Sequence, residues 1–128
     1  MNQQSLTSAV EGFILFRDHQ VWYRIIQPNQ EESGKLPILC LHGGPGIPHD
    51  YLEPLEALAH TGRRVIFYDQ LGCGNSDRAK NADLYSIDLF KDELVAIRSA
   101  LNLKQIHFFG QSWGAVWHWN ILFLNQLV

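Results

Sequence analysis

The sequence has few cysteines and lacks a long apolar run. Cys40 lies in an apolar stretch and Cys73 lies between glycines, with neither CxxC spacing nor a neighbouring cluster of ligands, so no zinc or other metal site is expected. No stretch reaches the roughly 18 apolar residues of a membrane span. Met1 to Val10 lacks the charged and apolar regions of a signal peptide. We therefore expect buried or incidental thiols in a soluble, cytoplasmic protein without membrane contacts.

A strong charge of one sign is also absent. The sequence has 10 basic and 13 acidic residues, a net charge of -3, and no basic run that could follow phosphates, so nucleic acid is not an expected partner. A hydrophobic content of 46% argues against disorder. No internal repeat or low-complexity segment divides the 128 residues, which predicts one folding unit of undetermined oligomeric state.

The apolar pattern predicts an α/β fold. Phe13 to Arg17 and Val21 to Ile26 are rich in aromatic and β-branched residues and flank a short polar stretch, which predicts an antiparallel hairpin at a sheet edge. Continuous apolar runs at 37–41, 64–68 and 105–109 predict parallel strands covered on both faces. Helical spacing predicts two helices between them, one through Leu52, Leu55, Leu58 and Ala59, and one after Ser86 through Ile87, Phe90, Leu94, Ile97 and Leu101.

This alternation of strands and helices favours right-handed crossovers, with ligands at the carboxyl ends of the strands. The first loop at such an end is HGGPG, residues 42–46. Its adjacent glycines allow positive φ and a close approach of backbone N–H groups to a ligand, and His42 is a candidate for orienting the loop. A tight turn that requires glycine would have the same sequence.

The second loop is DQLGCGNSD, residues 69–77. Gly72 and Gly74 are followed by Asp77 where a dinucleotide fingerprint has its third glycine, so no nucleotide cofactor is expected. Asp69 is a candidate catalytic acid, although an acid at a strand end beside a glycine turn more often binds loop amides. The remaining histidines have no metal-ligand spacing and are interpreted as surface or packing residues: His19, His49, His60 and His107.

The third loop has the G-x-S-x-G pattern of a nucleophile elbow, Gly110 to Gly114. The pattern alone is weak, but an apolar strand precedes it and an apolar segment of helical length follows, which is the context the motif requires. Ser112 would sit on a sharp, strained turn and attack a carbonyl carbon. The oxyanion that forms would be met by the N–H of Trp113 and by an N–H of the HGGPG loop.

In this order and spacing, HGGPG, YDQLGCGNSD and GQSWG resemble the proline iminopeptidase family of α/β-hydrolases, over about residues 11 to 114. The resemblance implies the N-terminal half of an α/β-hydrolase fold. It also implies that Ser112 is the nucleophile, that the backbones of Gly44 and Trp113 form the oxyanion hole, and that Gly43 takes part in substrate binding. The implied reaction removes an N-terminal residue, typically proline, from a short peptide through an acyl-enzyme.

The sequence departs from the family after Ser112. The superfamily places its catalytic Asp or Glu and then its His after the nucleophile. The residues that follow contain no Asp or Glu and a single histidine, His118, and the cap that carries the amine-binding acids is also missing. We therefore expect these 128 residues alone to be essentially inactive.

The tail after Gly114 is unusual, because Ala115 replaces the usual second glycine and the rest is apolar and aromatic. A frameshift or an early stop explains it, and so does a divergent buried helix. For function, a related amidase, lactonase or esterase is the alternative within enzymes. A non-catalytic pseudoenzyme, or a module completed by another chain, is the alternative outside them.

Overall fold

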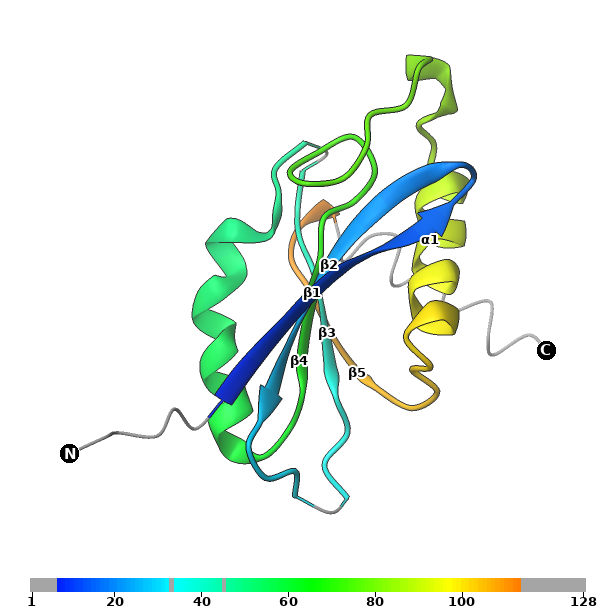
Figure 1. Cartoon of the computed structure of the whole chain (residues 1–128). Coiled ribbons are helices and arrows are strands. Elements are labelled where there is room, and N and C mark those ends of the chain that lie inside the picture. Colours follow the sequence, from blue (N-terminus) through cyan, green and yellow to red (C-terminus); the bar gives the residue numbers. More distant parts are fainter. Residues whose placement is uncertain (1–6, 33, 45, 114–128) are drawn as a thin grey trace.

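A computed structural model describes residues 7–32, 34–44 and 46–113, which form a five-stranded sheet in the order β1-β2-β4-β3-β5 (Figure 1). Strands β1 (Thr7–Phe16) and β2 (His19–Pro28) form an antiparallel hairpin at one edge. Its turn residues Arg17 and Asp18 have φ values of 46° and 62°, as tight hairpin turns require. The predicted edge hairpin is confirmed, and both strands extend further from the turn than the apolar pattern indicated.

The other strands are parallel to one another. β3 (Ile38–Leu41) lies between β4 (Val65–Tyr68) and β5 (His107–Gly110). The strand predicted at 105–109 begins and ends slightly later, because Gln105 and Ile106 precede β5 and Gly110 belongs to it. A short 3-10 turn, η2 (Ala82–Leu84), was not anticipated.

The two longer helices lie on opposite faces of the sheet (Figure 1). Across the sheet, the connection from β3 to β4 runs towards the hairpin. The connection from β4 to β5 runs the opposite way and passes over β3. Since connections between parallel strands are right-handed almost without exception, this reversal places η1 (His49–Thr61) and α1 (Ile87–Ala100) on different sides. The predicted helix at η1 is present but is of the 3-10 type. Pro54 within it has no N–H to donate.

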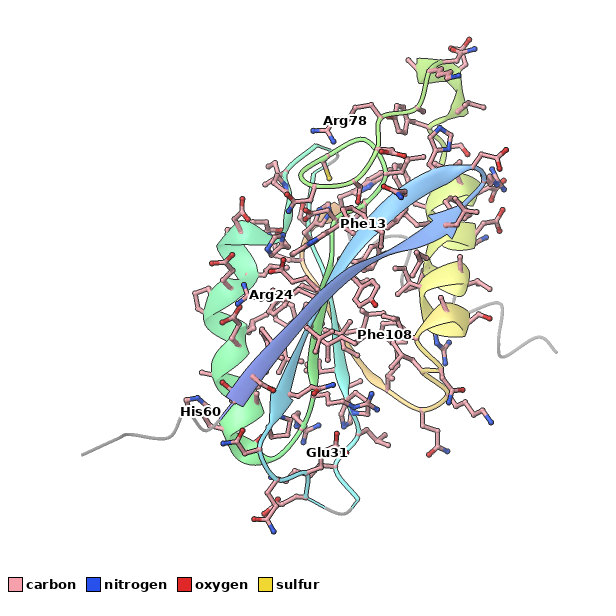
Figure 2. The ribbon with its side chains drawn as sticks, viewed as in Figure 1. Phe13, Arg24, Glu31, His60, Arg78 and Phe108 are labelled. Carbon is pink, nitrogen blue, oxygen red and sulfur yellow. The ribbon has the colours of Figure 1, made fainter. Side chains whose placement is uncertain are left out.

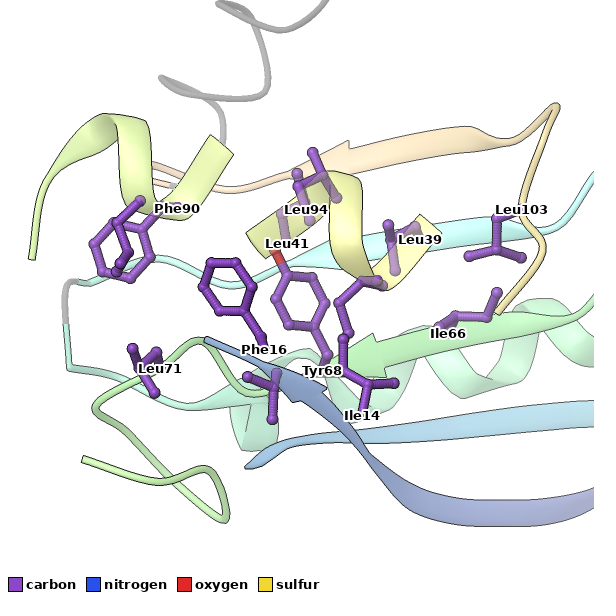
Figure 3. Packing of buried hydrophobic residues seen from close by; sticks show 13 residues of the cluster. Ile14, Phe16, Leu39, Leu41, Ile66, Tyr68, Leu71, Phe90, Leu94 and Leu103 are labelled. Atoms are coloured by element: carbon purple, nitrogen blue, oxygen red, sulfur yellow. The ribbon is translucent and has the colours of Figure 1, made fainter. Parts of the chain in front are cut away.

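The core has two layers because alternate strand residues face opposite helices. Towards α1, one cluster joins the hairpin, β3, β4 and the helix; it includes Ile14, Phe16, Leu39, Ile66, Tyr68 and Leu94 (Figure 3). Towards η1, a smaller cluster contains Ile26, Cys40, Leu52, Ala59, Val65 and Phe67. In Figure 2, Arg24 of β2 lies on the η1 side, where it pairs with Glu56 at 3.0 Å, and Phe108 of β5 lies near α1.

Burial differs between the parallel strands. β4 is buried throughout and β3 nearly so, as predicted for strands covered on both faces. β5 alternates between exposed and half-buried residues, and Phe109 is 37% exposed. Within the described ranges, no helix is long and apolar enough to cross a membrane.

Candidate functional site

The exits of β3, β4 and β5 meet at one end of the sheet. β3 pairs in parallel with both neighbours, and Leu41 is opposite Gly110 in register. The glycine loop, the 69–77 loop and the nucleophile elbow therefore start side by side. This convergence of the three motif loops is the arrangement that the α/β pattern predicted.

Ser112 lies at the elbow, one residue after Gln111, whose N–H still bonds Leu41 O at 3.2 Å. Its φ is 54°, a left-handed conformation that costs a non-glycine residue on the order of 1 to 3 kcal/mol. The predicted strained turn is confirmed. Ser112 is exposed and Trp113 is half-buried.

The glycine loop requires its glycines for two different reasons. Gly44 has a φ of 129°, and a Cβ there would lie 2.7 Å from Gly46 N. Gly43 is not in the positive-φ region, contrary to the expectation for both glycines, but a Cβ on it would lie 2.6 Å from Gln111 Oε1. Gly44 is therefore needed for its positive φ, and Gly43 is needed because its backbone lies so close to the elbow.

His42 joins the glycine loop to the loop after β4. Its Nε2 accepts the N–H of Gln70 at 2.9 Å, which assigns the proton to Nδ1, and Nδ1 then donates to Gly43 O at 2.7 Å. The Gln70 side chain donates to His42 O at 2.9 Å. Burial lowers the pKa of His42 and keeps the ring neutral. The predicted orienting role agrees with these bonds.

Asp69 binds loop groups, which was the more ordinary of its two interpretations. Its Oδ1 accepts the N–H of His49 at 3.0 Å and lies 2.7 Å from His49 Nδ1, and its Oδ2 accepts the N–H of Asn75 at 2.9 Å. Burial alone would raise the pKa of Asp69, but the bonds from His49 and Asn75 outweigh it and lower the pKa. Asp69 therefore holds the start of η1 and its own loop together.

Of the two interpretations given for His49, surface or packing residue, the structure supports packing, because its side chain is buried against Trp22 with ring centroids 4.5 Å apart. Burial opposes its charge, yet Asp69, Asp50 and Glu53 together raise its pKa. In the part of the chain described, His49, Asp50 and Glu53 have potential ligand atoms within 4.8 Å of one another. The two exposed carboxylates lie 3.4 Å from His49 Nε2 and favour the protonated form of the ring.

Glu93 supports the loop after β4, although no sequence motif marked it as a candidate. It is fully buried on α1, and its Oε2 accepts the N–H of Leu71 at 2.7 Å. Burial raises its pKa to about 8. Its position could have drawn attention, because Glu93 is three residues after Phe90 and four before Ile97, on the apolar face of the predicted helix.

A cavity of about 500 Å³ opens beside the elbow. Its walls come from the loop after β4, the start of α1 and the elbow, and are mostly apolar: they include Leu71, Cys73, Tyr85, Ile87, Phe90 and Trp113. Phe90 packs edge-on against Trp113, with ring centroids 6.0 Å apart. The cavity therefore adjoins one of the two predicted oxyanion donors.

A family model described as the alpha/beta hydrolase fold matches residues 37–120. The chain belongs to this family. It is 45% identical over 111 residues to a proline iminopeptidase of Clostridioides difficile, and the alignment covers 84% of this chain and 37% of that protein. It is 44% identical over 109 residues to a proline iminopeptidase of Lactobacillus helveticus, covering 84% and 36%.

Among solved structures, the proline iminopeptidase of Mycobacterium smegmatis matches with a TM-score of 0.80 and 41% identity, over 84% of this chain and 37% of that one. The fold class and the resemblance to proline iminopeptidases are confirmed. The chain spans little more than a third of the length of these relatives. His118 and the predicted tail helix lie outside the described residues, as does Pro45 of the glycine loop.

Proposed function

We propose that this chain carries the nucleophile and oxyanion half of a serine hydrolase that releases N-terminal proline, or another small residue, from short peptides. The observation that supports it most is the convergence of the glycine loop on a left-handed Ser112, in a chain 45% identical to a proline iminopeptidase. Ser112 Oγ attacks the scissile carbonyl carbon, and its proton passes to a general base. Collapse of the tetrahedral oxyanion breaks the C–N bond while the protonated base gives its proton to the departing amine of the shortened peptide. Water then hydrolyses the acyl-enzyme and restores the Ser112 hydroxyl.

The oxyanion donors in this proposal are the N–H groups of Trp113 and Gly44. The N–H of Gly43 already donates to the hydroxyl of Tyr51, which supports assigning the second donor to Gly44. Loss of one such donor typically costs about 3 kcal/mol of transition-state stabilisation. Gly43 contributes to the substrate-binding surface through the close approach of its backbone to Gln111.

The general base and its acid partner come from outside residues 1–113. His42 uses both ring nitrogens in bonds to Gln70 and Gly43, and His49 Nδ1 faces Asp69, so these two rings are already engaged. No Asp or Glu follows Ser112 in the sequence. Sequencing the coding DNA through and beyond codon 128 tests this directly, because a frame that supplies an Asp and then a His would complete the triad.

A chimera tests the proposal at the level of activity. Residues 1–113 of this chain would replace the matching segment of the Clostridioides difficile relative. We expect this chimera to release the arylamine from a prolyl arylamide. The matched Ser112→Ala chimera should lose at least about 10⁴-fold in kcat. A folded chimera with no more activity than its Ser112→Ala form would contradict the proposal, and cleavage of aryl esters or lactones alone would favour the esterase or lactonase alternative.

A non-catalytic role is the second candidate, and the exposed side of β5 favours it. Among the described strands, β5 pairs only with β3, and Phe109 on it is 37% exposed. An unpaired, apolar edge strand favours pairing with another chain. Size-exclusion chromatography of the 128-residue chain separates the candidates, since a clean monomer argues against a module completed by a partner and a defined complex that gains activity supports one.

A further inference from the structure

Tyr51 contacts two of the three site loops through one hydroxyl group. It lies in the first turn of η1, accepts the backbone N–H of Gly43 and donates to Gln111 Oε1 at 2.8 Å. A tyrosine hydroxyl has a single proton, so the bond to Gln111 uses that proton and the bond from Gly43 uses a lone pair. A directed chain of hydrogen bonds therefore runs from the exit of β3 through η1 to the exit of β5.

The backbones that this chain connects are already very close. A Cβ on Gly43 would lie 2.6 Å from Gln111 Oε1, 3.0 Å from the Tyr51 hydroxyl and 3.2 Å from Gln111 O. Gln111 is held from the other side by its N–H bond to Leu41 O. The Tyr51 hydroxyl thus fills the contact between Gly43 and Gln111, the residues that precede Gly44 and Ser112.

We propose that Tyr51 is a positioning residue of the oxyanion site. Its hydroxyl sets the spacing between the glycine loop and the elbow, and so between the N–H groups of Gly44 and Trp113. It also occupies the N–H of Gly43, so that Gly44 is the amide presented to the developing oxyanion. Consecutive hydrogen bonds polarise one another, which strengthens the connection. The catalytic meaning of this role rests on the proposed function, but the structural connection does not.

The first test uses amide resonances of the 128-residue chain. Tyr51→Phe removes the hydroxyl alone at a position 43% exposed. We expect the Gly43 amide to exchange with solvent roughly three- to tenfold faster, as for one lost hydrogen bond. The amide shifts of Gly44 and Trp113 should move with it. Tyr23→Phe is the matched control, because the Tyr23 hydroxyl lies against Gly12 of β1 in the edge hairpin; it should leave Gly43, Gly44 and Trp113 unchanged.

A second variant tests the proposal even if Tyr51→Phe does not fold. Gln111→Met keeps the bond between Gly43 and Tyr51 but removes the acceptor beyond it, and the Gly44 shift should still move. Unchanged Gly44 and Trp113 shifts in Tyr51→Phe, or an unchanged Gly44 shift in Gln111→Met, would overturn the proposal.

The chimera supplies a catalytic readout. Because an oxyanion bond forms only in the transition state, Tyr51→Phe should lower kcat by roughly tenfold with little change in KM. A change in KM alone would contradict a positioning role. If the parent chimera is inactive, the proposed function fails, while the amide measurements still decide whether Tyr51 connects the two loops.

Discussion

Glu93 shows how one buried side chain can support a site that it does not enter. Helical spacing predicted that Phe90, Leu94 and Ile97 share one face of a helix, and all three are buried in α1. Glu93 lies on that same face, and its carboxyl group accepts the N–H of Leu71. Leu71 directly follows the buried Gln70, whose N–H donates to His42. The carboxyl group thereby fixes the loop after β4 from the α1 side, opposite to Asp69 and η1.

The raised pKa of Glu93 predicts a pH-dependent stability. In the unfolded chain the carboxyl ionises near its ordinary pKa of 4.5, whereas in the folded chain its pKa is about 8. The free energy of unfolding should therefore fall as pH rises from 4.5 to 8 and then level off. Glu93→Gln cannot ionise and can still accept the Leu71 N–H. It should be more stable than the wild type at pH 8 by a few kcal/mol, since each pKa unit corresponds to about 1.4 kcal/mol.

Urea unfolding at pH 4.5, 6 and 8 measures this effect. Glu31→Gln, at an exposed loop position, is the control and should stay within about 0.5 kcal/mol of the wild type. A Glu93→Gln variant whose stability follows the wild-type pH dependence would show that another group is responsible.

At the scale of elements, the start of α1 determines where the wall of the cavity lies. Ser86 caps the helix, its Oγ accepting the N–H of Leu89 at 3.1 Å, as its residue type predicted. Tyr85, Ser86 and Ile87 all line the cavity beside Trp113. The Ser86 cap, which the sequence predicted, therefore helps to fix the part of the cavity wall formed by the start of α1.

Ser86→Ala should lower the free energy of unfolding by about 1 kcal/mol, because one N–H of the first helical turn loses its acceptor. Ser99→Ala, at an exposed position near the end of the same helix, should be neutral or slightly stabilising because alanine has the higher helix propensity. Urea unfolding of both variants is the measurement. Equal effects of the two substitutions would mean that the cap contributes no more than propensity does.

At the scale of the whole molecule, both thiols report on the integrity of the sheet. Cys40 is fully buried in β3 beneath η1, and Cys73 is 3% exposed in the loop after β4. Burial raises the pKa of each thiol to about 12, so neither forms the reactive thiolate at neutral pH. Of the expected alternatives, buried or incidental thiols, the structure supports burial, and both cysteines are free.

We expect neither thiol to react with an aromatic disulfide reagent at pH 7.5 in the folded chain, and both to react within seconds in urea. The rate should follow opening of the structure, and Cys73→Ala separates the contribution of the loop from that of the sheet. Rapid reaction of Cys40 in the absence of denaturant would contradict the burial of β3.

The sequence by itself determined the α/β class, the edge hairpin and the three loops, because apolar periodicity and glycine-rich motifs are local signals. The strained turn at Ser112 was also predicted from its motif, and the structure shows that the strain is a left-handed φ. Only the tertiary structure decided which groups support those loops. The bond between Tyr51 and Gln111 joins residues 60 positions apart in the sequence, and the bond between Glu93 and Leu71 joins residues 22 positions apart. The strand order that brings their loops together arises from two crossovers of opposite direction, which no local pattern encodes.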